Sequence, residues 1–254
     1  MIREQRLSKI KDALKQTGIV SINELTESLG ASRSTILRDL HDLEKNNELK
    51  CTRGGAVITK HMTSYEPPFN VRKEHFTDEK KRIVTAAMTL IQEKETLLLD
   101  SGTTVYALAQ ELKDAKNLYI ATNDLNSAMT LAANPDISLI VLGGTLRNGH
   151  YSLNGYFTEG MLSQIHADKV FLGVDAVDLN IGFMNFSVEE IQTKRLMIQA
   201  SHEVIVLCDH SKFETVAFAN ICSFKDVDLI ITGKEIDKTI LEKLQELDVR
   251  VMTV

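Results

Sequence analysis

The sequence predicts an α/β protein with two parts, a small helical head with a hairpin and a larger body with a mainly parallel sheet. Residues 1–58, the head, hold three amphipathic stretches at helical spacing, then two short extended pieces around a Gly-Gly pair. Residues 59–77, the linker, lack sustained periodicity and contain two of the chain's three prolines. In residues 78–254, the body, short apolar runs alternate with helical patterns, which is typical of a covered parallel sheet.

The overall composition is that of an ordinary globular protein. The chain has 254 residues, of which 43% are hydrophobic and 25% charged. Its apolar runs fall well short of the roughly 18 residues of a membrane span, and its charged N-terminal stretch does not resemble a signal peptide. The cysteines are far apart and show no metal-ligand spacing. We therefore expect a cytoplasmic location, no metal, no cofactor and free thiols at Cys51, Cys208 and Cys222.

Charge is distributed unevenly along the chain. The net charge is −6, yet the first 60 residues contain eleven Lys and Arg against eight Asp and Glu. The acidic excess therefore belongs to the body. A mildly basic segment on an acidic chain indicates a head that binds a polyanion.

The head contains three predicted helices. The first covers 3–16, the second is capped by Ser21 or Asn23, and the third covers 31–47 with Ser32 as its cap. A very short gap that contains a glycine separates the second and third, which is typical of a helix-turn-helix. The apolar stripes of the helices are Leu7, Ile10 and Leu14, then Ile22, Leu25 and Leu29, then Ile36, Leu40 and Leu43.

The exposed face of the third helix indicates that the polyanion is DNA. Its N-terminal half carries hydroxyl and guanidinium groups off the apolar stripe, and such groups contact phosphates and base edges in a helix-turn-helix. A hairpin at 48–58 follows, like the wing of a winged helix. An alternative is a solvated basic face on three ordinary helices, but helix, turn and basic hairpin occur in register. The predicted DNA-binding residues are Ser32, Arg33, Ser34, Thr35, Arg38, Lys50 and Arg53.

The linker and body follow in order. Pro67 and Pro68 favour extended backbone and oppose helix, so the linker is predicted to be a semi-rigid connector. The predicted strands of the body are 96–99, 118–121, 138–142, 169–174, 203–208, 228–232 and 249–253. The predicted helices are 79–92, 105–112, 124–133, 187–200 and 237–247.

Polar residues follow the predicted strands of the body. Small residues, hydroxyls, amides and a few charges recur there, and ligands of such sheets bind at the carboxyl ends of strands. Each loop alone could simply turn the chain. Together they indicate a pocket for a hydroxyl-rich anion, and the Ser-Gly-Thr-Thr turn before a helix is suited to phosphate. The loop residues are Asp100, Ser101, Gly102, Thr103, Thr104, Thr122, Asn123, Gly143, Gly144, Arg147, Asp175 and Lys212.

The motifs of both parts resemble the DeoR family of bacterial repressors. In the head the resemblance covers residues 6–43, with "SRSTILRDL" on the motif, and "RGGA" resembles the family's wing. It continues through "EPPF" and through "DSGTT", "TN", "GGTLR", "GVDA", "EEIQTKR" and "DHSKF". The family's sensor domain resembles ribose-5-phosphate isomerase.

The resemblance implies roles for individual residues. It implies that the Ser-Gly-Thr-Thr loop takes a phosphate and that Asp175, Glu190, Lys194 and Lys212 line a sugar site. Without it, Glu190 and Lys194 would read as an exposed ion pair on one helix face. His210 and the stretch 183–186 depart from the family pattern, which affects the identity of the effector.

Three functions fit these parts. We expect a repressor of a carbohydrate catabolic operon whose operator affinity is controlled by a phosphorylated sugar. We expect this repressor to be a dimer or tetramer and not to be an enzyme. An isomerase with a helical oligomerisation appendage is the rival, since Asp175 or Glu190 could act as a base. A repressor with a vestigial pocket is the third possibility. Gly-x-x-x-x-Gly-Lys-Ser/Thr, the P-loop motif, does not occur in the sequence.

Overall fold

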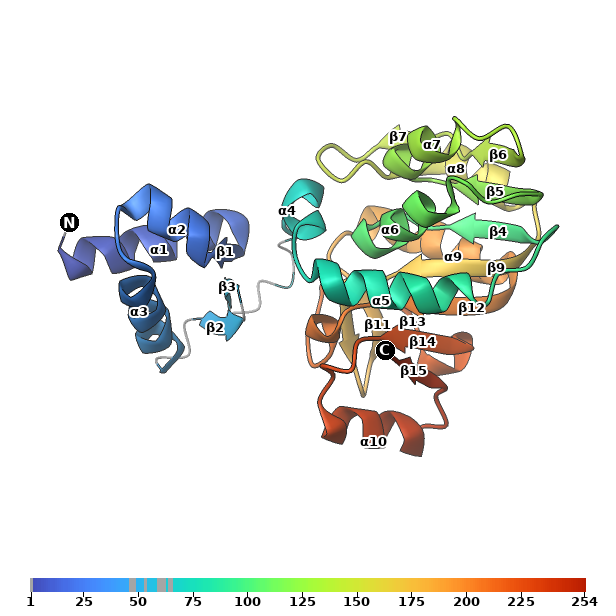
Figure 1. Cartoon of the computed structure of the whole chain (residues 1–254). Helices are drawn as coiled ribbons and strands as arrows, with labels where there is room; N and C mark the ends of the chain where they lie inside the picture. Colours follow the sequence, from blue (N-terminus) through green and yellow to red (C-terminus); the bar gives the residue numbers. More distant parts are fainter. Residues whose placement is uncertain (1, 46–48, 53, 59–62, 64–65) are drawn as a thin grey trace. The chain divides into compact units, whose positions relative to one another are not determined.

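A computed structural model describes residues 2–45, 49–52, 54–58, 63 and 66–254 (Figure 1). The chain divides into two compact units, residues 1–71 and residues 72–254. We call them the smaller and the larger unit. Among the described residues, no helix combines the length and the apolar character that crossing a membrane requires.

The smaller unit consists of three helices and a small sheet, as predicted. Ser21 caps the second helix through a reciprocal capping box with Glu24, which decides between the two predicted caps. Gly18 and Gly30 end the first two helices in the left-handed conformation. The helices are α1 (Arg3–Thr17), α2 (Ile22–Leu29) and α3 (Arg33–Lys45), and the strands are β1 (Ile19–Ser21), β2 (Leu49–Thr52) and β3 (Gly55–Ile58).

The predicted hairpin forms an antiparallel sheet in the order β1-β3-β2. Gly55 is required where β3 pairs with β1, because a Cβ there would lie 1.8 Å from the carbonyl oxygen of Val20. The predicted apolar stripes form the core of this unit, with Ile10, Ile36 and Leu40 fully buried.

The larger unit is built on a seven-stranded parallel sheet in the order β15-β14-β12-β9-β4-β5-β6 (Figure 1). Its strands match the seven predicted ones: β4 (Thr96–Leu99), β5 (Leu118–Thr122), β6 (Ile137–Val141), β9 (Ala167–Gly173), β12 (Ser201–Leu207), β14 (Leu229–Thr232) and β15 (Val251–Thr253). Its longer helices are α5 (Thr77–Met88), α6 (Thr103–Leu112), α7 (Leu125–Leu131), α8 (Tyr156–Leu162), α9 (Ile191–Gln199) and α10 (Lys238–Glu246).

Both faces of this sheet are covered, which explains its apolar strands. Leu97 and Leu99 of β4 join a core with α5 and α6, whereas Leu98 between them joins a core with α8 and α9. Because successive side chains of a strand alternate between faces, each central strand contributes to both cores. The α/β prediction is therefore confirmed.

Several short elements were not predicted. They are β7 (Thr145–Leu146), β8 (Leu153–Asn154), β10 (Ala176–Asp178), β11 (Gly182–Asn185), β13 (Ala219–Cys222), α8, and the 3-10 turns η1 (Val188–Glu190), η2 (His210–Lys212) and η3 (Phe224–Asp226). The strands β10, β11 and β13 form a separate antiparallel sheet. The predicted helix 187–200 is η1 followed by α9.

The predicted linker also differs from the structure in its second half. A short helix, α4 (Phe69–Lys73), directly follows Pro68, and α5 begins at Thr77. Proline opposes helix only within and before itself, so a helix can start immediately after it. Residues 59–62 and 64–65 of the linker lie outside the described residues.

Candidate functional site

The strand order of the larger sheet reverses between β4 and β9. From β4 the chain proceeds through β5 to β6 on one side, and from β9 through β12, β14 and β15 on the other. In open parallel sheets, ligands bind outside the carboxyl ends of strands at such a switch point. The residues that follow β4 and β9 are therefore the centre of the candidate site.

A buried ion pair occupies this switch point. Lys194 of α9 donates from Nζ to Oδ2 of Asp100 and, at 2.9 Å, to the carbonyl oxygen of Gly173. The same Asp100 oxygen accepts from the N–H of Gly173 at 2.9 Å. Asp100 is 0% exposed and Lys194 is 3% exposed. Lys194 thus joins the ends of β4 and β9 and is no exposed partner of a helix-surface pair.

The pKa values of this pair reflect burial and neighbouring carboxylates. Burial raises the pKa of Asp100, and Lys194 opposes this only in part. Burial alone would lower the pKa of Lys194, but Asp100, Glu190 and Asp175 raise it, and the net direction is upward. Lys194 is therefore a cation facing three carboxyl groups. Asp100 Oδ1 has no hydrogen-bond partner among the described residues.

Glu190 and Asp175 are both buried and held by several donors. Glu190 accepts from Ser152 Oγ at 2.6 Å and from Asn185 Nδ2 at 2.7 Å. Arg147 Nη1 lies 3.3 Å from the same carboxylate. Asp175 accepts from the N–H of Phe186 at 3.1 Å. These contacts bring the predicted Arg147, Asp175, Glu190 and Lys194 into one group with Asp100.

The Ser-Gly-Thr-Thr loop starts α6 beside this group. Gly102 precedes the helix with φ 133°, a conformation that favours glycine, and it provides no capping side chain. The first N–H groups of α6 therefore form a helix N-terminus of the kind that binds anions. The loop side chains are largely buried: Ser101, Thr103 and Thr104.

Loops after β5 and β6 supply further polar groups. Thr122, Asn123 and Asp124 are buried, and Asn123 Nδ2 donates to the carbonyl of Leu153 at 3.2 Å. Burial raises the pKa of Asp124 to about 6, against hydrogen bonds from Ser127. Among the described residues, Asn123 Oδ1 and Asp124 Oδ2 have no partner. Unpaired buried oxygens of this kind call for a ligand or water.

The Gly-Gly pair after β6 has a packing role. A Cβ on Gly144 would lie 2.1 Å from Oγ1 of Thr158, a side chain of α8 that donates to the carbonyl of Gly143 at 2.7 Å. These glycines let α8 approach the end of β6. Their contact with an effector stays a prediction.

Lys212 belongs to a second cluster. Its charge lies beside Asp209 and Lys80, and burial lowers the pKa of Lys80 to about 8. His210 is fixed by Glu79, which accepts from the His210 N–H at 2.7 Å and meets Nδ1 at 2.7 Å. His210 is thus a structural link between η2 and α5.

Some site residues were not predicted. Arg72 Nη1 lies 3.4 Å from Asp175 Oδ1, and Arg72 Nη2 lies 3.3 Å from Nδ1 of His150. Ser152, Asn154 and Asn185 are buried polar residues around Glu190. The sequence signal was weak, because Ser152 and Asn154 follow a loop and Asn185 lies in the unpredicted β11.

The head presents the predicted polar face of α3. Ser32 caps the helix by accepting from the Thr35 N–H at 3.2 Å. Ser32, Arg33, Ser34 and Arg38 are exposed, and Thr35 is half-buried. Asp39 of the same helix is buried and ion-paired with Arg6. Lys50 lies in β2, and Arg53 lies outside the described residues.

Both parts of the chain match models of one protein family. Residues 6–62 match the DeoR-like helix-turn-helix domain, and residues 75–234 match the DeoR C terminal sensor domain. The chain belongs to the DeoR family.

Curated DeoR-family relatives cover nearly the whole chain. The glycerol-3-phosphate regulon repressor of Escherichia coli is 35% identical over 97% of each chain. The transcriptional regulator GolR of Listeria innocua is 33% identical over 95% of each, and the repressor GlcR of Bacillus subtilis is 34% identical over 92% of this chain and 90% of its own. These names are those of regulators, so the prediction of a DNA-binding transcription regulator rather than an enzyme is confirmed.

Solved structures resemble the DeoR-family chain only in part. Ribose 5-phosphate isomerase A from Methanocaldococcus jannaschii matches with TM-score 0.40 and 18% identity over 54% of each chain. The delta subunit of eIF2B from Chaetomium thermophilum matches with TM-score 0.46 and 19% identity, over 63% of this chain and 57% of its own. Similarity at this level carries no information about activity.

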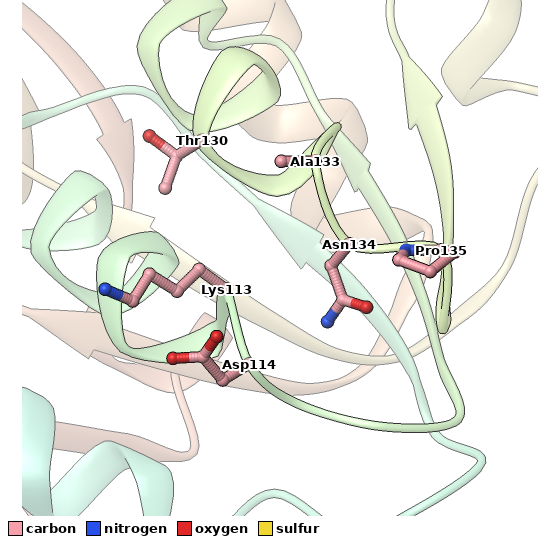
Figure 2. A pocket seen from close by; sticks show the side chains of 6 residues that line it. All are labelled: Lys113, Asp114, Thr130, Ala133, Asn134 and Pro135. Carbon is pink, nitrogen blue, oxygen red and sulfur yellow. The ribbon is translucent and has the colours of Figure 1, made fainter.

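A surface feature of this DeoR-family chain lies apart from the switch point. A surface depression of about 350 Å³ lies between the ends of α6 and α7 and the turn before β6 (Figure 2). It lies at the amino edge of the sheet. Its lining mixes polar and apolar residues: Lys113, Asp114, Thr130, Ala133, Asn134 and Pro135. It lies opposite to the candidate site and contains none of its residues.

Within the part of the chain that the structure describes, two groups of side chains have the donors for a metal ion, His41 with Glu44 and Cys51, and Glu79 with Asp209 and His210. In the first, Glu44 already accepts from the Cys51 N–H at 2.7 Å, and burial raises the pKa of the thiol to about 11. In the second, Lys80 and Lys212 lie beside Asp209 and oppose a cation. The expectation that the chain holds no metal stays a prediction.

Proposed function

We propose that this DeoR-family regulator represses a carbohydrate catabolic operon and that a phosphorylated sugar bound at the switch point controls its affinity for operator DNA. One observation carries the proposal. The N-terminus of α6 lies beside a buried group of three carboxylates, Lys194 and Arg147. A phosphate and several hydroxyls need these two kinds of partner side by side.

The phosphate is assigned to the loop 101–104. Its backbone N–H groups and the hydroxyls of Thr103 and Thr104 are donors, and the helix dipole favours a dianion. The three carboxylates are acceptors for sugar hydroxyls. Lys194 and Arg147 orient two of them, through the contacts of Lys194 with Asp100 and of Arg147 with Glu190. The relative named for the glycerol-3-phosphate regulon supports a small phosphorylated polyol or sugar as the ligand class.

The recognition surface is assigned to α3 and the wing. Arg33 and Arg38 are exposed cations with five N–H donors each, which suit guanine edges and phosphates. In this proposal, the hydroxyls of Ser32, Ser34 and Thr35 donate to phosphates. Lys50 and Arg53 of the predicted wing contact the sugar-phosphate backbone of the DNA. One such head covers too little DNA for high specificity, so we also propose a dimer or tetramer.

A ligand panel tests the proposal. Thermal unfolding of the full-length protein is followed with glycerol 3-phosphate, glucose 6-phosphate, fructose 6-phosphate, fructose 1-phosphate and their unphosphorylated forms. A ligand at a hundred times its Kd stabilises by about 2.7 kcal/mol, or roughly 5–10 °C for a domain of this size. Binding without turnover supports the regulator, whereas turnover supports an isomerase. No response to any phosphorylated compound contradicts the proposal.

The variant Thr103→Asp tests the phosphate position. A carboxylate in the first turn of α6 is compatible with the helix dipole, so the protein should fold and bind DNA. It places a negative charge where the dianion is assigned, and binding of the panel compound that stabilises the wild type should be lost. Thr85→Asp on α5 is the control. Wild-type affinity in Thr103→Asp would place the phosphate elsewhere.

A further inference from the structure

The short helix α4 is attached to the candidate site by its two cations. Arg72 is the first residue of the larger unit, and its guanidinium contacts Asp175 at 3.4 Å and His150 at 3.3 Å. Lys73 lies with Nζ 5.2 Å from the ring centroid of Tyr106. Tyr106 donates its N–H to the carbonyl of Gly102 in the phosphate loop. Arg72 thus contacts Asp175 of the candidate site, and its neighbour Lys73 contacts the first turns of α6, the helix that the phosphate loop begins.

The contacts of Arg72 are the kind that a ligand can exchange. Charge-assisted hydrogen bonds of Arg and carboxylate usually measure 2.7–2.9 Å. The contacts of the Arg72 guanidinium with Asp175 and His150 are longer, whereas Lys194 and Asp100 are in close contact. Asp175 is largely buried and Arg72 is half-buried, so solvent screens this pair only partly. A phosphate oxygen of the ligand could take the place of Asp175 on the guanidinium, and ligand hydroxyls could donate to Asp175 in place of Arg72.

The backbone of α4 is held independently of the guanidinium. Lys80 Nζ donates to the carbonyl of Arg72 at 2.6 Å, and the N–H of Val71 donates to the carbonyl of Pro68 at 3.0 Å. A helix of five residues has little stability of its own. Its conformation depends on these contacts, and it continues directly into Pro67-Pro68 and the chain toward the head.

We propose that Arg72 is a further effector-binding residue, and that the exchange of its contacts with Asp175 and His150 for contacts with the ligand changes α4 and so transmits occupancy to the linker. The inference rests on the proposed function. It adds a residue outside the loops at the strand ends and names the contacts through which the site reaches the rest of the chain.

The experiment compares full-length Arg72→Ala and Arg72→Lys with the wild type and with Arg82→Ala. Arg82 of α5 is a matched control because it also pairs with a carboxylate, Glu235, at 2.6 Å. The probe is the panel compound that most stabilises the wild type. Its Kd is measured by calorimetry, and operator affinity is measured with and without saturating probe on a DNA fragment selected from a random library by the wild type.

We expect Arg72→Ala to raise the Kd of the probe at least tenfold. The effect of the probe on DNA binding is the ratio of the operator affinity without probe to the operator affinity with probe, and this ratio should fall at least threefold. Arg72→Lys keeps the positive charge but loses the planar guanidinium with its several N–H donors. The Kd of the probe for this variant should therefore rise at least threefold. This variant decides the matter if Arg72→Ala does not fold. The melting temperature without probe is measured for each variant, because a purely structural role would lower it and leave the Kd unchanged.

Two results would overturn the inference. One is a probe Kd within twofold of the wild type in both Arg72 variants. The other is an equal loss in Arg82→Ala, which would show a general effect of removing a cation. The proposed function fails separately, when the wild type itself responds to none of the phosphorylated compounds.

Discussion

The ion pair of Lys194 and Asp100 illustrates how single residues define this site. Two ions that are almost fully buried are costly to desolvate, so their presence is poorly explained by stability alone. In the sequence, helical spacing showed Lys194 as a partner of Glu190, and the family resemblance implied a place for it at a sugar site. In the structure it also spans the ends of two central strands, which a sequence pattern cannot reveal.

Lys194→Met should destabilise the larger unit strongly. Removing one partner leaves Asp100 as a buried charge without compensation, which typically costs about 3–5 kcal/mol. The free energy of unfolding from urea denaturation measures the loss. The double variant Lys194→Met/Asp100→Leu should lose clearly less, because both charges are removed together. A double variant as unstable as the single one would contradict this account.

His210 should make stability depend on pH. The hydrogen bond of Glu79 raises the pKa of His210 above its ordinary value, against burial, and Asp209 and Glu235 add to the rise. The folded protein therefore keeps this proton to higher pH than the unfolded chain. Its stabilising contribution is complete below about pH 6.5 and is lost as pH rises through the folded pKa.

The comparison of the wild type with His210→Gln isolates this effect. Between pH 6 and pH 8.5, the free energy of unfolding of the wild type should fall relative to that of the variant. Denaturation at half-unit pH steps measures both, and the slopes of other groups cancel in the difference. Parallel curves would show that the bond to Glu79 does not shift the titration of His210.

At the scale of elements, α3 combines a buried acid with exposed cations. Asp39 pairs with Arg6 of α1, and this ion pair joins the two helices. Arg38 is exposed, and we therefore expect it to contact DNA. Arg38→Ala should weaken operator binding by about 1–3 kcal/mol at constant salt. The exposed Arg250→Ala is the control, and probe binding should not change. Undiminished operator affinity in Arg38→Ala, measured by fluorescence anisotropy, would refute the assignment of α3.

The prolines before α4 belong to the same scale. Pro67 and Pro68 stiffen the chain that leads into α4. Replacing both by Gly should leave the separate affinities for probe and operator near normal but reduce their coupling, which is typically about 1–3 kcal/mol. Titration of the probe with and without operator measures the coupling from both sides. Equal coupling in both proteins would mean that it passes through another route, such as an oligomer interface.

Elements with a local sequence signature were predictable, and elements without one were not. Each of the seven strands of the large sheet is an apolar run bounded by polar turns, and each was predicted. The strands β10 and β11 are short, and their sheet is completed by β13 about 35 positions later in sequence. The helix α8 begins with exposed aromatic residues and so lacks a clear apolar stripe. The strand order, which locates the switch point, depends on pairing between distant segments.

At the scale of the whole molecule, the larger unit leaves aromatic surface exposed. Tyr156 and Phe157 at the start of α8 are 84% and 70% exposed, and their rings meet edge to face at 5.5 Å. With about 150–250 Å² per aromatic side chain, this pair approaches the size of the largest apolar patches of monomers. The sheet edge β6 also exposes Ile140 and Val141. We propose that a second copy of the chain covers this surface, in line with the dimer or tetramer proposed above.

Tyr156→Ser/Phe157→Ser should therefore lower the oligomeric mass. Sedimentation equilibrium of the full-length protein measures the dissociation constant, which should rise at least tenfold if the pair lies at the centre of the interface. Phe218→Ser removes another exposed aromatic side chain and is the control. An unchanged dissociation constant would exclude this surface from the interface.

The pairing of β4 with β9 also has a consequence for synthesis. Contacts between these strands join residues 72 positions apart, so the central sheet cannot form until much of the larger unit has left the ribosome. The smaller unit is made first, has its own core and closes through short loops. Domains fold as units, N-terminal first, and local contacts form faster than distant ones. During each round of translation, a folded head therefore precedes the sheet that carries the candidate effector site.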